Sequence, residues 1–177
     1  MHMNTIPIII ISLLTGFHVL TDLGINPDNY KLCAINSLFN DTIPPVNNEI
    51  LNFVNTKINK KVGRGECWDL AAQALNSVEA KWDGKFKFGN EINFDLDSVY
   101  PGDIIQFKGV KVKYIENGIK YTENMTQHTA IIYTVKGKGV FDLAHQNTHI
   151  SGKKVGISEL DLKNIVKGKY IIYRPIR

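Results

Sequence analysis

The sequence is poor in cysteine and has no concentrated block of positive charge, and both shortages narrow the class of protein. Only Cys33 and Cys67 occur among its 177 residues, so at most one disulfide is possible. Lysine and arginine number 21 against 17 acidic residues, but they occur singly or in pairs along the whole chain. A nucleic-acid-binding protein would gather them into a patch with interleaved aromatic residues. We therefore predict one globular domain with a solvated, mildly basic surface and no nucleic-acid partner.

The N-terminal segment lacks charge. Residues 6–20 (IPIIIISLLTGFHVL) are apolar over about fifteen residues, which is shorter than the ~20 residues of a membrane-spanning helix and typical of the apolar part of a secretory signal. The five residues before this run contain no lysine or arginine, and no small-x-small cleavage site precedes Asp22. We favour a signal peptide over residues 1–22 and a secreted or periplasmic protein, with an uncleaved N-terminal membrane anchor as the alternative.

Two helices are predicted in the first part of the remaining chain. Residues 23–45 are rich in asparagine and proline and show no sustained period, so we interpret them as a linker that precedes a domain over residues 46–177. Over residues 46–60, apolar side chains recur every three or four residues, as in an amphipathic helix. After a loop at residues 61–65, a second helix begins near Cys67. Its apolar face consists of Cys67, Leu70, Ala71, Ala74, Leu75 and Val78.

The second half of the chain changes to the two-residue period of strands. Strands are predicted over residues 103–107, 127–135, 140–147 and 169–175, and residues 111–122 are predicted to form a hairpin closed by Asn117 and Gly118. Ser158 and Asp161 indicate a short capped helix over residues 158–161. Helices followed by a meandering antiparallel sheet make an α+β fold, with the N-terminal helices packed on the sheet.

The stretch VGRGECWDL places Cys67 in the first turn of the second helix. A helix N-terminus favours a thiolate, because its unpaired N–H groups and its dipole stabilise negative charge. We therefore expect Cys67 to be an acidic, reactive thiol that forms no disulfide with Cys33. Gly63 and Gly65 are expected to let the backbone turn tightly and to leave room for a substrate. The alternative is that Cys67 is simply a small buried apolar residue.

Two histidines lie in predicted strands. By the two-residue period, His128 faces the same side as Ala130 and Ile132, and His145 faces the same side as Leu143 and Asn147. A thiol nucleophile needs an imidazole as base, and that imidazole needs a polar group to fix its tautomer. The alternative is a core histidine bonded to the backbone and a polar strand end at the sheet rim.

These residues also carry a family resemblance. The segments VGRGECWDL, YPGDIIQF, QHTAIIYTV and LAHQN resemble, in order and spacing, the papain-like cysteine hydrolases of the NlpC/P60 and CHAP type. The resemblance covers about residues 46–177 and implies a papain-like fold. It implies that Cys67 is the nucleophile and His128 the base. His145 would orient His128 as in NlpC/P60 proteins, whereas a CHAP-like pattern would give Asn147 a share of that role.

The resemblance implies a cysteine peptidase or amidase that uses no cofactor. We expect a monomer that cleaves an amide or peptide bond in cell-wall peptidoglycan, with the hairpin at residues 111–122 as one wall of the cleft. The alternatives are the same fold acting on a non-wall amide or acyl substrate, and a catalytically inactive binding domain. A zinc site built from Cys67, His128 and His145 is disfavoured because no two of these ligands are closely spaced in the sequence.

Overall fold

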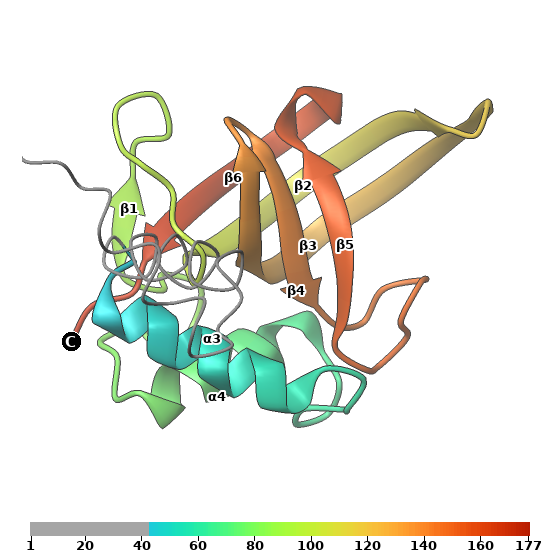
Figure 1. Ribbon diagram of the computed structural model, residues 1–177. Coiled ribbons are helices and arrows are strands. Elements are labelled where there is room, and N and C mark those ends of the chain that lie inside the picture. The colour runs from blue at the N-terminus through green and yellow to red at the C-terminus, as the bar shows by residue number, and fades with distance from the viewer. Residues whose placement is uncertain (1–42) are drawn as a thin grey trace, which may run out of the picture. The chain divides into compact units, whose positions relative to one another are not determined.

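The computed structural model describes residues 43–177, in which two helices accompany a six-stranded sheet (Figure 1). The predicted signal peptide and nearly all of the predicted linker lie outside these residues. Within the described part, no helix has the length and apolar character needed to cross a membrane.

The two helices begin close to the positions that their apolar patterns predict. Helix α3 (Pro45–Lys57) begins with a proline, whose missing N–H is not needed in the first turn. It ends three residues earlier than predicted, because Ile58 forms a bridge with Val155 and Asn59 has a left-handed φ of 61°. Helix α4 (Cys67–Ser77) begins at the cysteine itself.

All neighbouring strands of the sheet are antiparallel. Their order across the sheet is β1 (Asn90–Ile92), β6 (Ile165–Arg174), β2 (Ile104–Glu116), β3 (Ile119–Gly137), β4 (Val140–His145) and β5 (Gly156–Asp161). The predicted α+β arrangement, with helices preceding an antiparallel sheet, is therefore confirmed.

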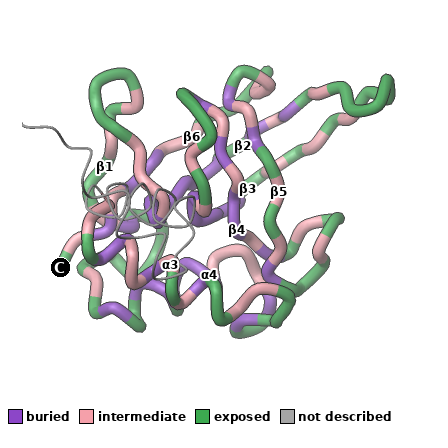
Figure 2. Tube along the Cα trace, in the orientation of Figure 1, coloured by how far each residue is buried: buried purple, intermediate pink, exposed green. Residues whose placement is uncertain are grey.

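Both faces of the sheet are covered in its middle, where Figure 2 shows the buried residues gathered. Ile104 and Ile131 belong to a core cluster with apolar residues of the two helices, such as Ile50 and Leu75. The alternate positions, such as Ile105, belong to a second cluster. Since successive side chains of a strand point to opposite faces, a strand covered on both sides needs apolar residues at consecutive positions, as Ile104 and Ile105 provide.

The Pro-Gly-Asp sequence before β2 is a structural anchor. The carboxylate of Asp103 is fully buried and accepts hydrogen bonds from the Arg174 guanidinium at 3.0 and 2.8 Å and from Asn47 Nδ2 at 2.8 Å. A Cβ added to Gly102 would lie 2.6 Å from the Asn47 carbonyl oxygen. This turn therefore ties β2 to β6 and to α3 and leaves no space for a larger residue.

The predicted strand at residues 103–107 and the predicted hairpin at residues 111–122 are parts of one long β2–β3 hairpin (Figure 1). A register shift between β2 and β6 near Gly109, whose φ is 62°, interrupts the sequence pattern without ending the β2–β3 pairing. The apolar period fades beyond this point because the tip is exposed to solvent, as Figure 2 shows.

The predicted helix at residues 158–161 is wrong. These residues lie in β5, which pairs with β4 along its whole length, from Val140 opposite Asp161 to His145 opposite Gly156. The helical signal belongs one turn later, because Asp161 caps the short η1 (Leu162–Asn164) by accepting a hydrogen bond from the Lys163 N–H. Strand pairing, which depends on residues distant in sequence, overrides the local capping pattern.

Candidate active site

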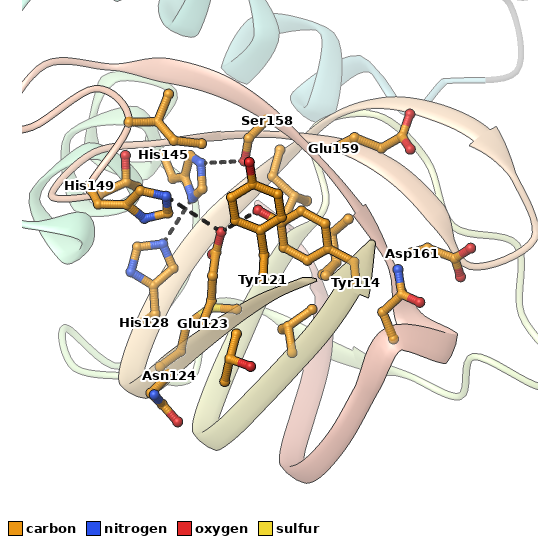
Figure 3. Close-up of a pocket in the computed structure, with 18 of the residues that line it drawn as sticks. Tyr114, Tyr121, Glu123, Asn124, His128, His145, His149, Ser158, Glu159 and Asp161 are labelled. Carbon is orange, nitrogen blue, oxygen red and sulfur yellow. Dashed lines mark hydrogen bonds and ion pairs between the residues drawn. The ribbon is translucent and has the colours of Figure 1, made fainter. Parts of the chain in front are cut away.

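A cavity of about 990 Å³ is lined by residues of β2 to β5 and by Cys67 at the start of α4. Cys67, His128 and His145 all line this cavity, and the close-up in Figure 3 shows the two histidines. The three residues that the sequence singled out are thus brought to one place, although they come from α4, β3 and β4. Among residues 43–177, no group of three or more His, Cys, Asp or Glu residues is placed to hold a metal ion.

Cys67 is a half-buried free thiol at the first residue of α4. Burial raises the pKa of Cys67, and the nearby carboxylate of Glu66 raises it further, whereas the backbone N–H groups of Thr129, Trp68 and Cys67 lower it. The backbone N–H groups at the helix start lower the pKa of Cys67, as predicted, but desolvation of the thiol raises this pKa by more. The expectation of an acidic thiol is therefore wrong, and the resting form at neutral pH is the thiol.

The loop before Cys67 turns as the two glycines predict. Gly63 and Gly65 have left-handed φ angles of 57° and 86°. The space beside them is filled by protein, because an added Cβ would lie 3.0 Å from Asp69 at Gly63 and 2.8 Å from Lys153 at Gly65. The glycines thus permit close packing of the loop, and the predicted room for a substrate is not found beside them.

Gln146 connects this loop to the end of β4 through hydrogen bonds. The sequence pattern did not identify this residue. Its side chain is fully buried. Its Nε2 donates to the carbonyl oxygens of Val62 at 2.9 Å and Glu66 at 2.8 Å, and its Oε1 accepts from the Val62 N–H at 3.2 Å. Three hydrogen bonds from one buried amide fix the position of the cysteine loop relative to His145.

The two histidines form a directly hydrogen-bonded pair (Figure 3). His128 Nε2 lies 3.0 Å from His145 Nδ1, and His145 Nε2 lies 2.8 Å from Ser158 Oγ on β5. Burial lowers the pKa of His128 to about 4, and burial together with the neighbouring His128 lowers the pKa of His145 to about 3. Both imidazoles are therefore neutral at pH 7, and a neutral imidazole can accept a proton.

Among the described residues, no hydrogen bond joins Asn147 to either histidine. Its Nδ2 donates to Glu66 Oε2 at 2.7 Å, and Lys153 forms an ion pair with the same carboxylate. The prediction that Asn147 shares a strand face with His145 is wrong, because β4 ends at His145 and Asn147 has a left-handed φ of 62°. Of the two candidates for the third position, the structure brings only His145 to His128.

Cys67 is influenced by the backbone of β3 next to the histidine pair. The backbone N–H of Thr129, the residue after His128, is one of the groups that lower the pKa of Cys67. Within the described residues no hydrogen bond joins the Cys67 sulfur to His128 itself. Because His128 Nε2 is paired with His145 Nδ1, Nδ1 is the nitrogen of His128 that is left for another partner.

The β2–β3 hairpin supplies one wall of the cavity, as the sequence suggested. Tyr114 and Tyr121 lie opposite each other in the hairpin, and their rings stack at 5.1 Å. The Tyr114 hydroxyl donates to Glu123 Oε1 at 2.9 Å, and His149 Nε2 lies 3.7 Å from the same oxygen (Figure 3). Burial and the Glu123 hydrogen bond raise the pKa of Tyr114 to about 12.

The two buried imidazoles lead to a prediction about stability in acid. Folding lowers the pKa of His128 from an ordinary 6.5 to about 4, so the unfolded chain takes up a proton first as the pH falls. The free energy of unfolding is therefore expected to fall between pH 6.5 and pH 4, by about 3 kcal/mol for His128 alone. Urea unfolding followed by circular dichroism between pH 7 and pH 5 measures this slope before most carboxylates titrate.

Two variants test whether His128 causes the pH dependence of the free energy of unfolding. His128→Gln is expected to make the pH dependence shallower, with the remaining slope due to His145, whereas His149→Gln, at a histidine whose side chain is 65% exposed, keeps both imidazoles of the pair and is expected to change the slope much less. Equal slopes in the parent and the His128→Gln protein would contradict the prediction.

The comparisons with known proteins agree with the fold. The chain has the fold of a cysteine proteinase of the papain-like superfamily, which confirms the resemblance seen in the sequence at that level. The match is to the family model described as the AIM3/BBC1 cysteine proteinase-fold domain, over residues 45–177, and the chain belongs to this family. The narrower prediction of an NlpC/P60 or CHAP protein is not confirmed.

One curated relative and two solved structures illustrate the similarity. The chain is 29% identical over 149 residues to "Altered inheritance of mitochondria protein 3" of Debaryomyces hansenii, covering 72% of this chain but only 15% of that protein. A crystal structure of Ly7917 with the hydrolyzing product of MDP matches at a TM-score of 0.46 and 16% identity, over 73% of this chain and 62% of that one. A second structure of Ly7917 matches at a TM-score of 0.41 and 18% identity, over 72% and 62%.

The prediction of a secreted or periplasmic protein is wrong. A curated relative, of the yeast Debaryomyces hansenii, is named for the inheritance of mitochondria, a name that contradicts the export prediction. The comparisons likewise give no support for peptidoglycan as the substrate. An uncharged apolar run of about fifteen residues is a weak signal, because it lacked the preceding positive charge and the cleavage site that define an export signal. The alternative of a membrane anchor concerned residues that lie outside the described part.

Proposed function

We propose that this domain hydrolyses an amide bond in a peptide other than cell-wall peptidoglycan. Cys67 is the nucleophile, His128 is the general base and His145 orients His128. The observation that carries this proposal is a single cavity lined by a free thiol at a helix start and by a hydrogen-bonded pair of neutral imidazoles. A nucleophile, a base and an orienting group are the three parts that acyl transfer by a thiol needs.

The proposed reaction follows from the protonation states. The Cys67 proton passes to His128 Nδ1 as the sulfur attacks the substrate carbonyl carbon, and the resulting imidazolium donates from Nε2 to His145 Nδ1. The amide C–N bond then breaks, the departing amine takes the proton from His128, and a thioester remains on Cys67. Water attacks the thioester and gives its proton to His128. The acid product leaves, and the thiol is restored with the same proton.

The substrate proposed for first testing is a peptide with basic residues. The described residues that line the cavity include four carboxylates and no lysine or arginine, although lysine and arginine outnumber acids in the whole chain. Glu159 and Asp161 form ion pairs with Lys136 and Lys163, so Glu116 and Glu123 contribute most to the negative charge of the wall. Positive side chains are favoured beside such a wall.

A catalytically inactive binding domain is the second candidate. Two observations favour it: burial raises the pKa of Cys67, and no hydrogen bond joins the Cys67 sulfur to His128 within the described residues. Such a domain would hold a peptide in the same cavity without cleaving it.

The experiment that separates the two candidates uses the full chain and a pool of unstructured peptides of mixed sequence, half of them rich in lysine and arginine. Mass spectrometry of the products is expected to reveal cleavage, with the basic peptides preferred. Iodoacetamide should stop the reaction by alkylating Cys67, and the chelator EDTA should not. Peptide retention without any product, in parent protein and alkylated protein alike, would favour the binding domain.

A further inference from the structure

The histidine pair continues into a third side chain that the sequence pattern did not connect with it. Ser158 lies on β5 opposite Leu143 of β4, and its Oγ is 2.8 Å from His145 Nε2. We propose that Ser158 is a positioning residue for His128, acting through His145. Its effect on turnover rests on the proposed hydrolysis, whereas its effect on the two imidazoles does not.

The chain of hydrogen bonds allows two arrangements of protons. In the first, His128 Nε2–H donates to His145 Nδ1, and His145 Nε2–H donates to Ser158 Oγ. In the second, every bond is reversed: the serine hydroxyl donates to His145, and His145 Nδ1–H donates to His128 Nε2. A neutral imidazole has one N–H, so the first arrangement leaves His128 Nδ1 free and the second places a proton on it.

Only the first arrangement suits a base. His128 Nδ1 must be unprotonated to accept the proton of Cys67. Once it has done so, both ring nitrogens of His128 carry protons, and Nε2 must donate to an unprotonated His145 Nδ1. His145 then has to keep its own proton on Nε2, where Ser158 is the acceptor that the structure provides. The serine oxygen is thus needed both before and after the proton moves.

Removing the Ser158 hydroxyl favours the second arrangement of protons in the His128–His145 pair, which does not suit a base. His145 is half-buried in the cavity wall, and its Nε2–H would lose its acceptor in Ser158→Ala. Among buried backbone groups, an N–H without an acceptor is rarer than a C=O without a donor, and by the same reasoning the lone pair rather than the proton is expected at Nε2. The proton of His145 then moves to Nδ1, and the second arrangement, with a protonated His128 Nδ1, becomes populated.

The test measures kinetics and tautomers in the full chain. Ser158→Ala is expected to lower kcat roughly five- to a hundredfold, the penalty of one unsatisfied buried polar group, with KM unchanged. In ¹⁵N-histidine-labelled protein at pH 7, long-range ¹H–¹⁵N correlations should show His128 Nδ1 unprotonated in the parent and partly protonated in Ser158→Ala. Ser158→Thr keeps the hydroxyl and should restore both the parent kcat and an unprotonated His128 Nδ1. Ser98→Ala, at an exposed serine that does not line the cavity, is the control.

The kinetic and NMR measurements test the proposed hydrolysis and the role of Ser158 separately. If the parent protein hydrolyses nothing, the proposed function fails, and the tautomers alone decide the role of Ser158. A parent protein with a protonated His128 Nδ1 overturns the role of Ser158 even if the alanine variant does not fold. Unchanged tautomers and an unchanged kcat in folded Ser158→Ala also overturn it.

Discussion

Replacing Cys67 with alanine is expected to abolish peptide hydrolysis while leaving the domain folded. No other cysteine lies in the described residues, and a hydrolase without its nucleophile retains only the contribution of binding, so the loss should reach a factor on the order of 10⁴ or more. The side chain is only half-buried and forms part of a cavity wall, so the cost in unfolding free energy should be about 1 kcal/mol or less. Turnover of the best peptide and thermal unfolding by circular dichroism measure the two effects.

The matched control is Cys33→Ser, which removes the other thiol of the chain and is expected to leave turnover unchanged. Parent-level turnover in folded Cys67→Ala would remove the nucleophile from the proposed mechanism. Loss of turnover in Cys33→Ser, together with retained turnover in Cys67→Ala, would show that the reactive thiol had been assigned to the wrong cysteine.

Replacing His128 or His145 is expected to give the next largest losses of turnover. The comparison also shows which residue orients His128. His128→Ala should lose nearly as much turnover as Cys67→Ala, because a nucleophile and its base act as a unit. His145→Ala should lower kcat between about tenfold and a thousandfold, because His128 then loses the acceptor that orients it. Steady-state rates, with circular dichroism to confirm folding, give these values.

Asn147→Gly is the informative comparison at the competing position. Glycine tolerates the left-handed φ of 62° at this residue, so the variant removes the amide without straining the backbone. The lost hydrogen bond runs to Glu66 in an exposed part of the loop, and the expected change in kcat is less than about fivefold. A loss in Asn147→Gly as large as that in His145→Ala would show that the asparagine shares the orienting role.

The register of β3 and β4 explains why the sequence did not decide between His145 and Asn147 as the residue that orients His128. In the β3–β4 pair Ile131 lies opposite Ala144, so three further steps along both strands would place Asn147 opposite His128. The alternation of apolar residues in VFDLAHQN is consistent with a strand that continues that far. The strand ends at His145 instead, because Gln146 turns into the interior to bond Val62 and Glu66. A local pattern does not contain these partners, which lie 84 and 80 residues away.

The sequence by itself determined the features that depend on near neighbours. The sequence predicted a helix start near Cys67, the apolar faces of both helices, the tight turn at Gly63 and Gly65, and the strand that carries His128. All of these follow from periods and turn residues within short windows. The order of helices and strands then sufficed for the fold class. The export prediction failed for a related reason, because local hydrophobicity does not specify where an apolar segment functions.

The tertiary structure alone decided what each polar group meets. It paired His128 with His145, attached Ser158 to that pair, turned Asn147 toward Glu66 and placed Gln146 beneath the cysteine loop. It also reversed the expected pKa shift of Cys67, because the extent of burial exceeds the influence of the helix start. Hydrogen-bond partners and desolvation depend on strand register and packing between distant segments, and neither is encoded within the span of a single helix or strand.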